Sequence, residues 1–150
     1  MPYVEREILM AGEPGPIYEL AKDMESFPQF MRDVQSVKVI RRQGATTVTE
    51  WEAEVDGVPI MWTEEDTFDD AAYRIHYRLI EGDLDKFEGE WRFERVDGGT
   101  RVVLTVDFDF GLPELTNLIG DTLQLKVIEN CDMMLQGMKA RVEGVPCGEA

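Results

Sequence analysis

The clearest stretch of the sequence is residues 87–94, which read Phe87-Glu88-Gly89-Glu90-Trp91-Arg92-Phe93-Glu94. Every second residue is apolar or glycine, and every residue between them is charged. Because neighbouring side chains of a β-strand point to opposite faces, this pattern predicts a strand with one covered face and one solvent-exposed face. It favours an antiparallel sheet that packs a core on one side.

The same period of two continues on both sides of this stretch, from Val34 to Phe110. Turn-forming residues interrupt it at Gln43-Gly44, Asp56-Gly57, Asp69-Asp70, Glu81-Gly82-Asp83 and Asp97-Gly98-Gly99. This spacing predicts six antiparallel strands. Residues 4–10 add a first strand, so we expect a sheet of about seven strands.

Helical patterns lie outside the region of regular strands. After the first strand, residues 17–21 predict a short helix with Pro16 in its first turn, and residues 23–31, which contain Pro28, predict a second short helix or a turn. From Pro113 an apolar stripe recurs every three or four residues to about Val142, and it predicts a long terminal helix. We expect Gly120 to interrupt this helix and Asp121 to cap its longer part.

Together these elements predict an α+β fold in which a curved antiparallel sheet of about seven strands grips the long C-terminal helix. We expect a single domain over residues 1–150, with an ordered core at about 3–142 and a loose tail at 143–150. A strongly curved sheet cannot contact a straight helix along its whole length. A cavity is therefore expected between sheet and helix.

The composition limits the classes of ligand. The chain has 150 residues, 43% of them hydrophobic, and a net charge of −16. This charge repels phosphate backbones and anionic lipid surfaces, so we expect no nucleic-acid partner and a small molecule as ligand. No apolar run approaches the roughly 18 residues that span a bilayer, and no signal peptide is evident, which predicts a cytoplasmic protein without stable membrane insertion. Cys131 and Cys147 are expected to be free thiols.

Residues for metal or cofactor chemistry are scarce. The one histidine, His76, alternates onto the charged face of its strand between Arg74 and Arg78, where a solvated position is expected. A multi-histidine metal site is therefore excluded, and the sequence has no Cys-x-x-Cys pair and no phosphate-binding glycine loop. We expect neither a metal nor a cofactor.

Two carboxylates are the candidate catalytic residues. Glu64 and Asp66 alternate in phase with Trp62 and Phe68. If these aromatic side chains face the cavity, the carboxylates do so as well. Such a buried pair needs a cationic partner or bound water, or else its pKa rises toward the range of a general acid or base. A β-bulge would instead turn Glu64 and Asp66 to solvent. The pattern leaves both alternatives open.

The cavity walls are predicted from the inward phase of the strands and from the helical stripe. Large apolar and aromatic side chains in these positions suit a ligand site, although ordinary core packing explains them too. The predicted ligand-binding residues are Trp51, Trp62, Ile75, Tyr77, Phe87, Trp91, Leu104, Phe108, Leu118, Leu123 and Met134.

The chain resembles the START-like (SRPBCC) superfamily, specifically its polyketide cyclase/dehydrase and coenzyme Q-binding branch. Three segments carry the resemblance: residues 18–31 with an aspartate followed by an aromatic-proline run, residues 81–93 with Gly89-Glu90-Trp91, and Gly98-Gly99-Thr100-Arg101-Val102. With the terminal helix they cover most of residues 3–142 in the expected order. The resemblance implies the helix-grip fold and a cavity for lipids, quinones, hormones or polyketides.

The resemblance leaves the function open, because the superfamily contains both carriers and enzymes. In its aromatase/cyclases the corresponding strand carries, as we align it, an inward serine and arginine where this chain has Glu64 and Asp66, and a pocket tyrosine where it has Val34. The first expectation is a protein that binds a hydrophobic or amphipathic molecule. The second is a cyclase/dehydrase-type enzyme that uses Glu64 or Asp66 for proton transfer, and the third is a module that acts on a protein partner.

Overall fold

The computed structural model describes residues 3–55, 57–109 and 113–144, with the side chains of all of these except 55, 58 and 113–123. In chain order the elements are β1 (Tyr3–Met10), α1 (Pro14–Lys22), the short 3-10 helix η1 (Met24–Gln29), β2 (Val34–Gln43), β3 (Thr46–Val55), β4 (Val58–Asp69), β5 (Arg74–Gly82), β6 (Lys86–Val96), β7 (Gly99–Asp109) and α2 (Pro113–Glu143). Most of the tail predicted for residues 143–150 lies outside the described residues.

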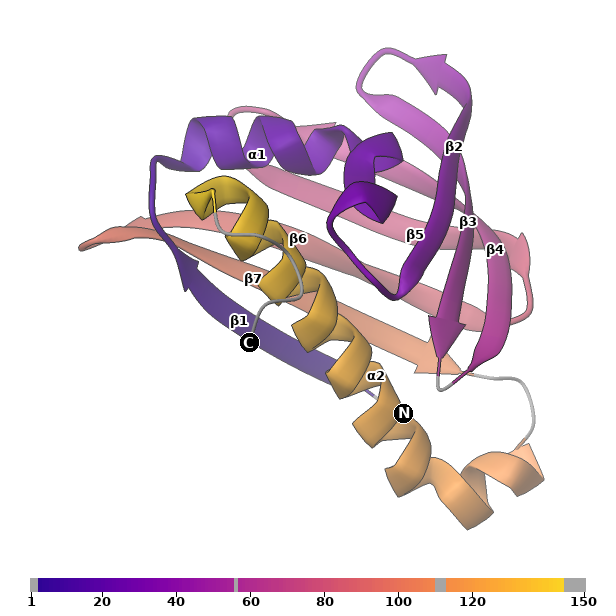
Figure 1. The fold of residues 1–150 in the computed structure, drawn as a ribbon. Coiled ribbons are helices and arrows are strands. Elements are labelled where there is room, and N and C mark those ends of the chain that lie inside the picture. The colour runs from indigo at the N-terminus through magenta and orange to yellow at the C-terminus, as the bar shows by residue number, and fades with distance from the viewer. Residues whose placement is uncertain (1–2, 56, 110–112, 145–150) are drawn as a thin grey trace.

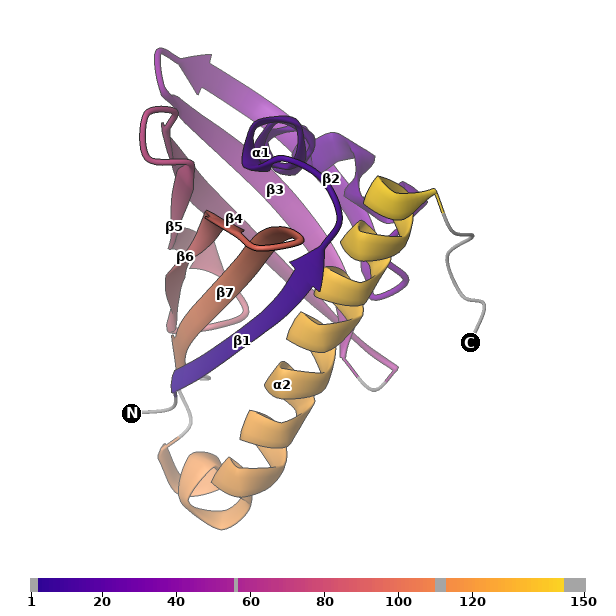
Figure 2. The same ribbon diagram turned by 90° about the vertical axis from the view of Figure 1, so that its left-hand side faces the viewer.

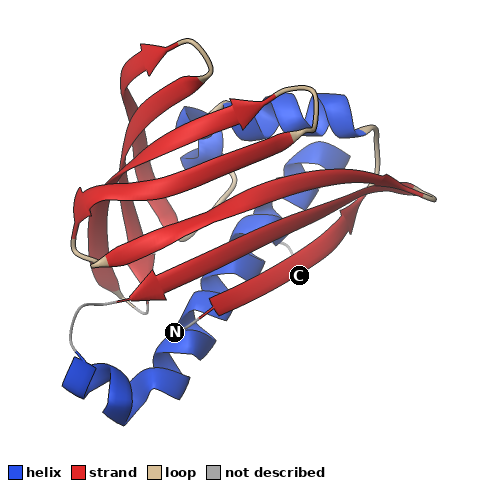
Figure 3. Ribbon diagram, turned by 180° about the vertical axis from the view of Figure 1, so that it is seen from behind, coloured by secondary structure: helices blue, strands red, loops and turns tan. Residues whose placement is uncertain are grey.

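The strands form one antiparallel sheet of seven strands in the order β1-β7-β6-β5-β4-β3-β2, as predicted. Consecutive strands pair through short turns, except that β1 lies beside β7. The sheet is open, with β1 and β2 as its two edges. It bends around α2, which lies along its concave face (Figures 1 and 2), and the view from behind shows the sheet in front of the helix (Figure 3).

A bulge in the neighbouring strand β5 explains which face of the sheet each β4 side chain joins. Thr63 pairs with Glu81, whereas the next residue, Glu64, pairs with Leu79, so the extra residue is Ile80 of β5. β4 itself therefore keeps a regular alternation. Of the two alternatives for this strand, the one that places Glu64 on the inner face with the aromatic side chains is correct.

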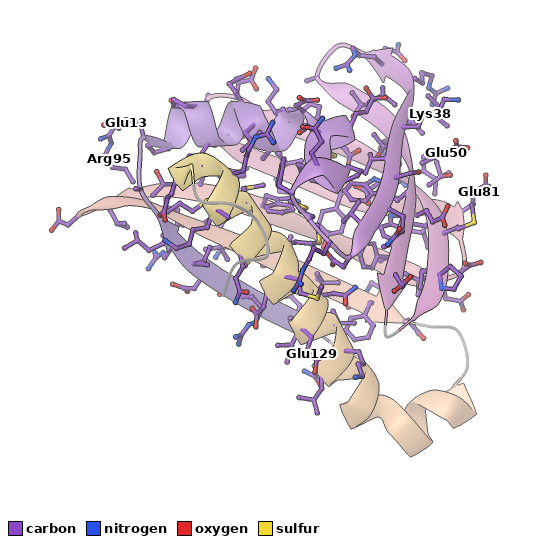
Figure 4. The ribbon with its side chains drawn as sticks, viewed as in Figure 1. Glu13, Lys38, Glu50, Glu81, Arg95 and Glu129 are labelled. Atoms are coloured by element: carbon purple, nitrogen blue, oxygen red, sulfur yellow. The ribbon has the colours of Figure 1, made fainter. Side chains whose placement is uncertain are left out.

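The helices close the concave side. α1 and η1 cover one end of the sheet, and Glu13 beside α1 forms an ion pair with Arg95 of β6 (Figure 4). α2 is held to the edge strand β1, where Arg6 donates two hydrogen bonds to the Asp132 carboxylate at 2.8 and 3.0 Å. The predicted interruption at Gly120 is wrong at the level of secondary structure, because α2 is one continuous helix, although its first turns lie at an angle to the rest (Figures 1 and 3).

No helix in the described ranges is long and apolar enough to cross a membrane. The largest fully buried side chains come from all the layers, including Tyr18 of α1, Phe27 of η1, Ile75 of β5 and Met138 of α2. Helices and sheet therefore share one hydrophobic core.

Gly137 sets how closely α2 approaches the segment after η1. A Cβ atom at this position would overlap the carbonyl oxygen of Phe30 and crowd the Cα atom of Met31. Only glycine allows the helix and this backbone to touch. The contact fixes the C-terminal half of α2 against Phe30 and Met31, which are themselves buried.

We predict that Gly137→Ala lowers the free energy of unfolding by about 2 kcal/mol or more, because helix and loop must move apart. The sign of the change in unfolding free energy separates two effects, because helix propensity alone would stabilise the alanine variant by about 1 kcal/mol. Chemical denaturation measures the change. Gln136→Ala, at the exposed neighbouring position, is the matched control and should stay within about 0.5 kcal/mol of the wild type. A Gly137→Ala variant as stable as the wild type would contradict the close approach.

Candidate functional site

A cavity of about 90 Å³ lies between the concave face of the sheet and α2. Its walls come from β2 to β7 and from the middle of α2. Eight of the predicted ligand-binding residues line it: Trp51, Trp62, Tyr77, Phe87, Trp91, Leu104, Phe108 and Met134. The structure therefore brings together, around one space, side chains that are more than 80 positions apart at the extremes of this set.

Three predicted residues stand apart from this group. Ile75 is fully buried in the hydrophobic core but is not among the residues that line the cavity. Its inward phase on β5 was read correctly, but a residue on the inner face meets either the ligand space or another core side chain, and the sequence pattern is the same for both. The side chains of Leu118 and Leu123 lie outside the described residues.

The cavity also has walls outside the predicted set of ligand-binding residues, although Val34 was aligned with a pocket position by the family resemblance. These are Asp33, Val34, Ala53, Ile60, Leu84, Val106, Val127, Asn130 and Cys131. Helical spacing could have found those on α2, because Val127, Asn130, Cys131 and Met134 follow each other at the offsets that share one helix face. Asp33 had no such signal, since it lies between η1 and β2 and belongs to no periodic element.

The pairing of β3 with β4 brings the aromatic side chains of one cavity wall together. Trp51 of β3 pairs with Trp62 of β4, and their rings stack with centroids 5.5 Å apart and planes 10° from parallel. Phe87 of β6 packs on both Trp62 and Tyr77, at 5.1 and 5.4 Å between ring centroids. Such contacts fix large rings in place, so this side of the cavity is a preformed apolar surface.

The hydroxyl of Tyr77 is already used by the protein. It donates a 2.5 Å hydrogen bond to the backbone carbonyl of Thr105 on β7, across Gly89 of β6. A Cβ atom at Gly89 would overlap this carbonyl and crowd the tyrosine oxygen, which explains the glycine in the middle of the strand. Tyr77 is therefore placed to offer its ring, rather than its hydroxyl, to the cavity.

Glu64 and Asp66 are both buried, with 3% and 0% of their surface exposed, and Glu64 lines the cavity. Trp62 Nε1 donates to Glu64 Oε1 at 2.8 Å, and Asp66 Oδ2 accepts from Thr49 Oγ1 at 2.7 Å and from Thr47 Oγ1 at 3.5 Å. The partners are neutral donors, and no lysine, arginine or histidine in the described part of the chain pairs with either carboxyl.

Burial raises the pKa of both carboxyls, and the two are hydrogen-bonded to each other. Desolvation is the largest cause for each, and the negative charge of Asp66 raises the pKa of Glu64 further. The hydrogen bonds that Asp66 accepts from Glu64, Thr49 and Thr47 oppose the rise in its own pKa. A hydrogen bond between two carboxyls requires a proton on one of them, and Glu64 lines the cavity, so the pair can give or accept a proton at the cavity wall.

Asp33 is a third buried carboxyl, separate from this pair along the chain. Only 3% of its surface is exposed, it lines the cavity, and its Oδ1 atom has no hydrogen-bond partner among the described residues. Burial raises the pKa of this carboxyl to about 6, opposed by a backbone hydrogen bond and by the charge of Arg32. Its backbone carbonyl accepts a 2.8 Å hydrogen bond from the amide of Glu54, which ties the residue to β3.

The other reactive side chains do not form a catalytic group in the described residues. Burial raises the pKa of Cys131 to about 12, so its thiol stays protonated. His76 is exposed on the outer face of the sheet, as predicted, 3.7 Å from Glu90. No cluster of three or more metal-ligating side chains occurs in the described ranges.

Comparisons with known proteins agree with this architecture. The family model described as "Polyketide cyclase / dehydrase and lipid transport" matches residues 10–131. A Thermus thermophilus protein with a known crystal structure is 35% identical in sequence. The alignment covers 95% of this chain and 98% of that protein, and the two structures superpose with a TM-score of 0.91. The Zhui aromatase/cyclase from a Streptomyces species is 22% identical, with coverage of 94% and 93% and a TM-score of 0.85. A Streptomyces cyaneus protein with the provisional name polyketide cyclase is 24% identical, over 97% of this chain and 96% of its own.

A curved sheet that grips a terminal helix around an apolar cavity defines the class of helix-grip proteins. Within that class, the chain belongs to the polyketide cyclase/dehydrase and lipid transport family. The family resemblance read from residues 18–31, 81–93 and 98–102 is therefore confirmed.

We predict that Asp33 makes stability fall as the pH rises. An unfolded aspartate has a pKa of 3.8 and Asp33 in the folded protein about 6, so the folded state keeps its proton over a range in which the unfolded chain has lost it. The penalty appears as the pH rises from about 4 and is complete above about 6. Because asparagine does not ionise, the stability of Asp33→Asn relative to wild type should grow by about 3 kcal/mol between about pH 4 and about pH 8.

Urea unfolding at a series of pH values measures this difference. Titration of Glu64 and Asp66 affects wild type and variant alike, so the difference isolates Asp33. Gln136→Ala, which replaces no ionisable group at an exposed position, is the control and should give a difference that does not change with pH. A flat difference for Asp33→Asn would rule out the raised pKa.

Proposed function

We propose that the protein binds a hydrophobic or amphipathic small molecule, of lipid, quinone or polyketide type, in the cavity between the sheet and α2. The composition of the cavity walls is the observation that supports this proposal. Apart from Asp33, Glu64 and Asn130, the described lining residues are apolar or aromatic. A ligand gains about 25 cal/mol for each Å² of apolar surface removed from water, before the costs of association. The lipid transport named in the family description supports the same function.

The cavity is small for such a ligand. Its volume of about 90 Å³ is below the ~150 Å³ that admits a benzene ring in an engineered apolar cavity. A larger ligand therefore requires wall side chains to move. Val127 and Met134 of α2 are only partly buried, and methionine adapts its shape at low cost, so the helix side of the cavity is the movable part of the wall in our proposal.

A second candidate function is an enzyme of the cyclase/dehydrase type. The specific observation that favours it is the hydrogen-bonded pair of Glu64 and Asp66, which has a raised pKa and reaches the cavity through Glu64. In this alternative the pair transfers a proton to or from a polyketide-like substrate. The aromatase/cyclase with the same fold supports this reading by analogy only.

The remaining sequence-based expectations belong to the same proposal. We propose that the protein works in the cytoplasm, without nucleic acid and without a resident cofactor or metal. A protein partner that receives or delivers the ligand is compatible with a carrier.

We predict that freshly purified protein carries an apolar molecule that organic extraction removes, because the cavity walls favour such a ligand over water. Native mass spectra before and after extraction measure its mass and stoichiometry. Met134→Trp should reduce the retained ligand by about tenfold or more, since the larger side chain fills the cavity. Met133→Trp changes the same residue type at the neighbouring position, which does not line the cavity, and should retain the ligand. Equal retention by both variants would place the ligand elsewhere.

We predict that Glu64→Gln combined with Asp66→Asn abolishes turnover if the protein is an enzyme. The amides keep the shape and hydrogen-bonding capacity of the pair but cannot transfer the proton. Mass spectrometry of a poly-β-ketone substrate, followed for cyclisation and loss of water, measures turnover. Undiminished turnover in the double variant would eliminate the pair as the acid/base, whereas ligand retention without turnover in the wild type would leave the carrier function.

A further inference from the structure

The ionisable groups at the cavity all have the same sign. Asp33 and Glu64 line it, and Asp66 lies directly behind Glu64 through their shared hydrogen bond. The 15 lysine and arginine residues and the one histidine of the chain all fall within the described residues, and none of them lines the cavity. A ligand with a carboxylate, sulfonate or phosphate group would therefore enter without a cationic partner and beside buried acids.

Asp33 is the carboxyl at the cavity wall to which no side chain is hydrogen-bonded among the described residues. Glu64 is hydrogen-bonded to Trp62 and Asp66. Asp66 Oδ2 accepts from Thr49, and its Oδ1 is buried without a partner, but Asp66 does not line the cavity. The Asp33 carboxyl has one backbone hydrogen bond, its Oδ1 has no partner, and no ion pair joins it to the exposed Arg32. A buried polar group without a partner destabilises the protein unless a ligand completes it.

We propose that the cavity selects uncharged ligands that carry a hydroxyl or carbonyl oxygen, that it excludes acidic amphiphiles such as fatty acids, and that Asp33 determines this selectivity. The inference rests on the proposed binding function and narrows its ligand class. A hydroxyl of the ligand donates to the ionised carboxyl, and a ligand carbonyl accepts from the protonated one, so either completes the hydrogen bonding of Asp33.

An anionic ligand has no such arrangement. Two negative charges in a poorly hydrated cavity repel each other more strongly than in water, because little solvent screens them. The net charge of −16 adds repulsion during approach. Glu64 and Asp66 are hydrogen-bonded to each other, so this pair needs no charged group from a ligand. An uncharged ligand meets no charge repulsion from any of the three carboxyls.

The test uses two dyes that share one ring skeleton: uncharged N-phenylnaphthylamine and its sulfonate analogue, anilinonaphthalene sulfonate. Fluorescence titration at about pH 8, above the pKa of Asp33, gives both dissociation constants for wild type and for Asp33→Asn. We expect Asp33→Asn to tighten binding of the sulfonate dye by roughly tenfold relative to any change in binding of the uncharged dye, so the ratio of the two dissociation constants is the readout. Circular dichroism shows whether the variant is folded.

Asp97→Asn is the matched control, because it removes the same charge from an exposed position, and it should change neither dissociation constant. Sulfonate binding that is equal in wild type, Asp33→Asn and Asp97→Asn would overturn the role of Asp33. Sulfonate binding to the wild type as tight as that of the uncharged dye would overturn the exclusion of anions. If the wild type bound neither dye, the proposed binding function itself would fail, and this inference would fail with it.

Discussion

The structure depends on one geometric constraint: a straight helix must cover the inner face of a sheet that curves away from it. Near its C-terminal end, α2 touches the backbone after η1 at Gly137, and Leu135 and Met138 are fully buried there. Further toward the N-terminus, at Val127 to Met134, sheet and helix diverge, and side chains no longer fill the space. The same helix therefore provides close packing at one place and a cavity wall at another. Different turns of α2 therefore contribute to stability and to the walls of the ligand cavity.

The second feature is the way in which the sheet tolerates buried acids. Asp66 and Glu64 receive hydrogen bonds from threonine and tryptophan side chains of β3 and β4, not from cations. Neutral donors lower the cost of burial only in part, so the pKa of both carboxyls stays raised. Whether the pair is structural or catalytic, it has the same property: a carboxyl proton is retained in apolar surroundings. Whether a substrate exchanges that proton separates an enzyme from a carrier.

The sequence predicted the strands and most of the aromatic wall, because a period of two directly reports which face of a sheet a residue joins. It could not decide the direction of Glu64, since the answer depends on which of two paired strands carries the extra residue, and Ile80 on β5 takes that place. It did not find Asp33, which has no periodic neighbours, and it could not separate Ile75 in the core from the residues that line the cavity, because core and cavity positions share one pattern. Periodicity thus gives the face of a side chain, while the boundary between packed core and open space depends on tertiary distances that no local pattern contains.

The open sheet has a consequence for the behaviour of the protein at high concentration. Exposed edge strands invite pairing with another chain, which leads to aggregation. On β1, Gln124 of α2 donates to the carbonyl of Tyr3 at 3.3 Å, so the helix occupies part of that edge. On β2, Lys38, Arg41 and Arg42 are exposed (Lys38 is labelled in Figure 4), and two copies docking through β2 would bring these positive charges together. The charges on β2 do not depend on the helix, so that edge stays protected when the sheet loosens its grip on α2 to admit a ligand.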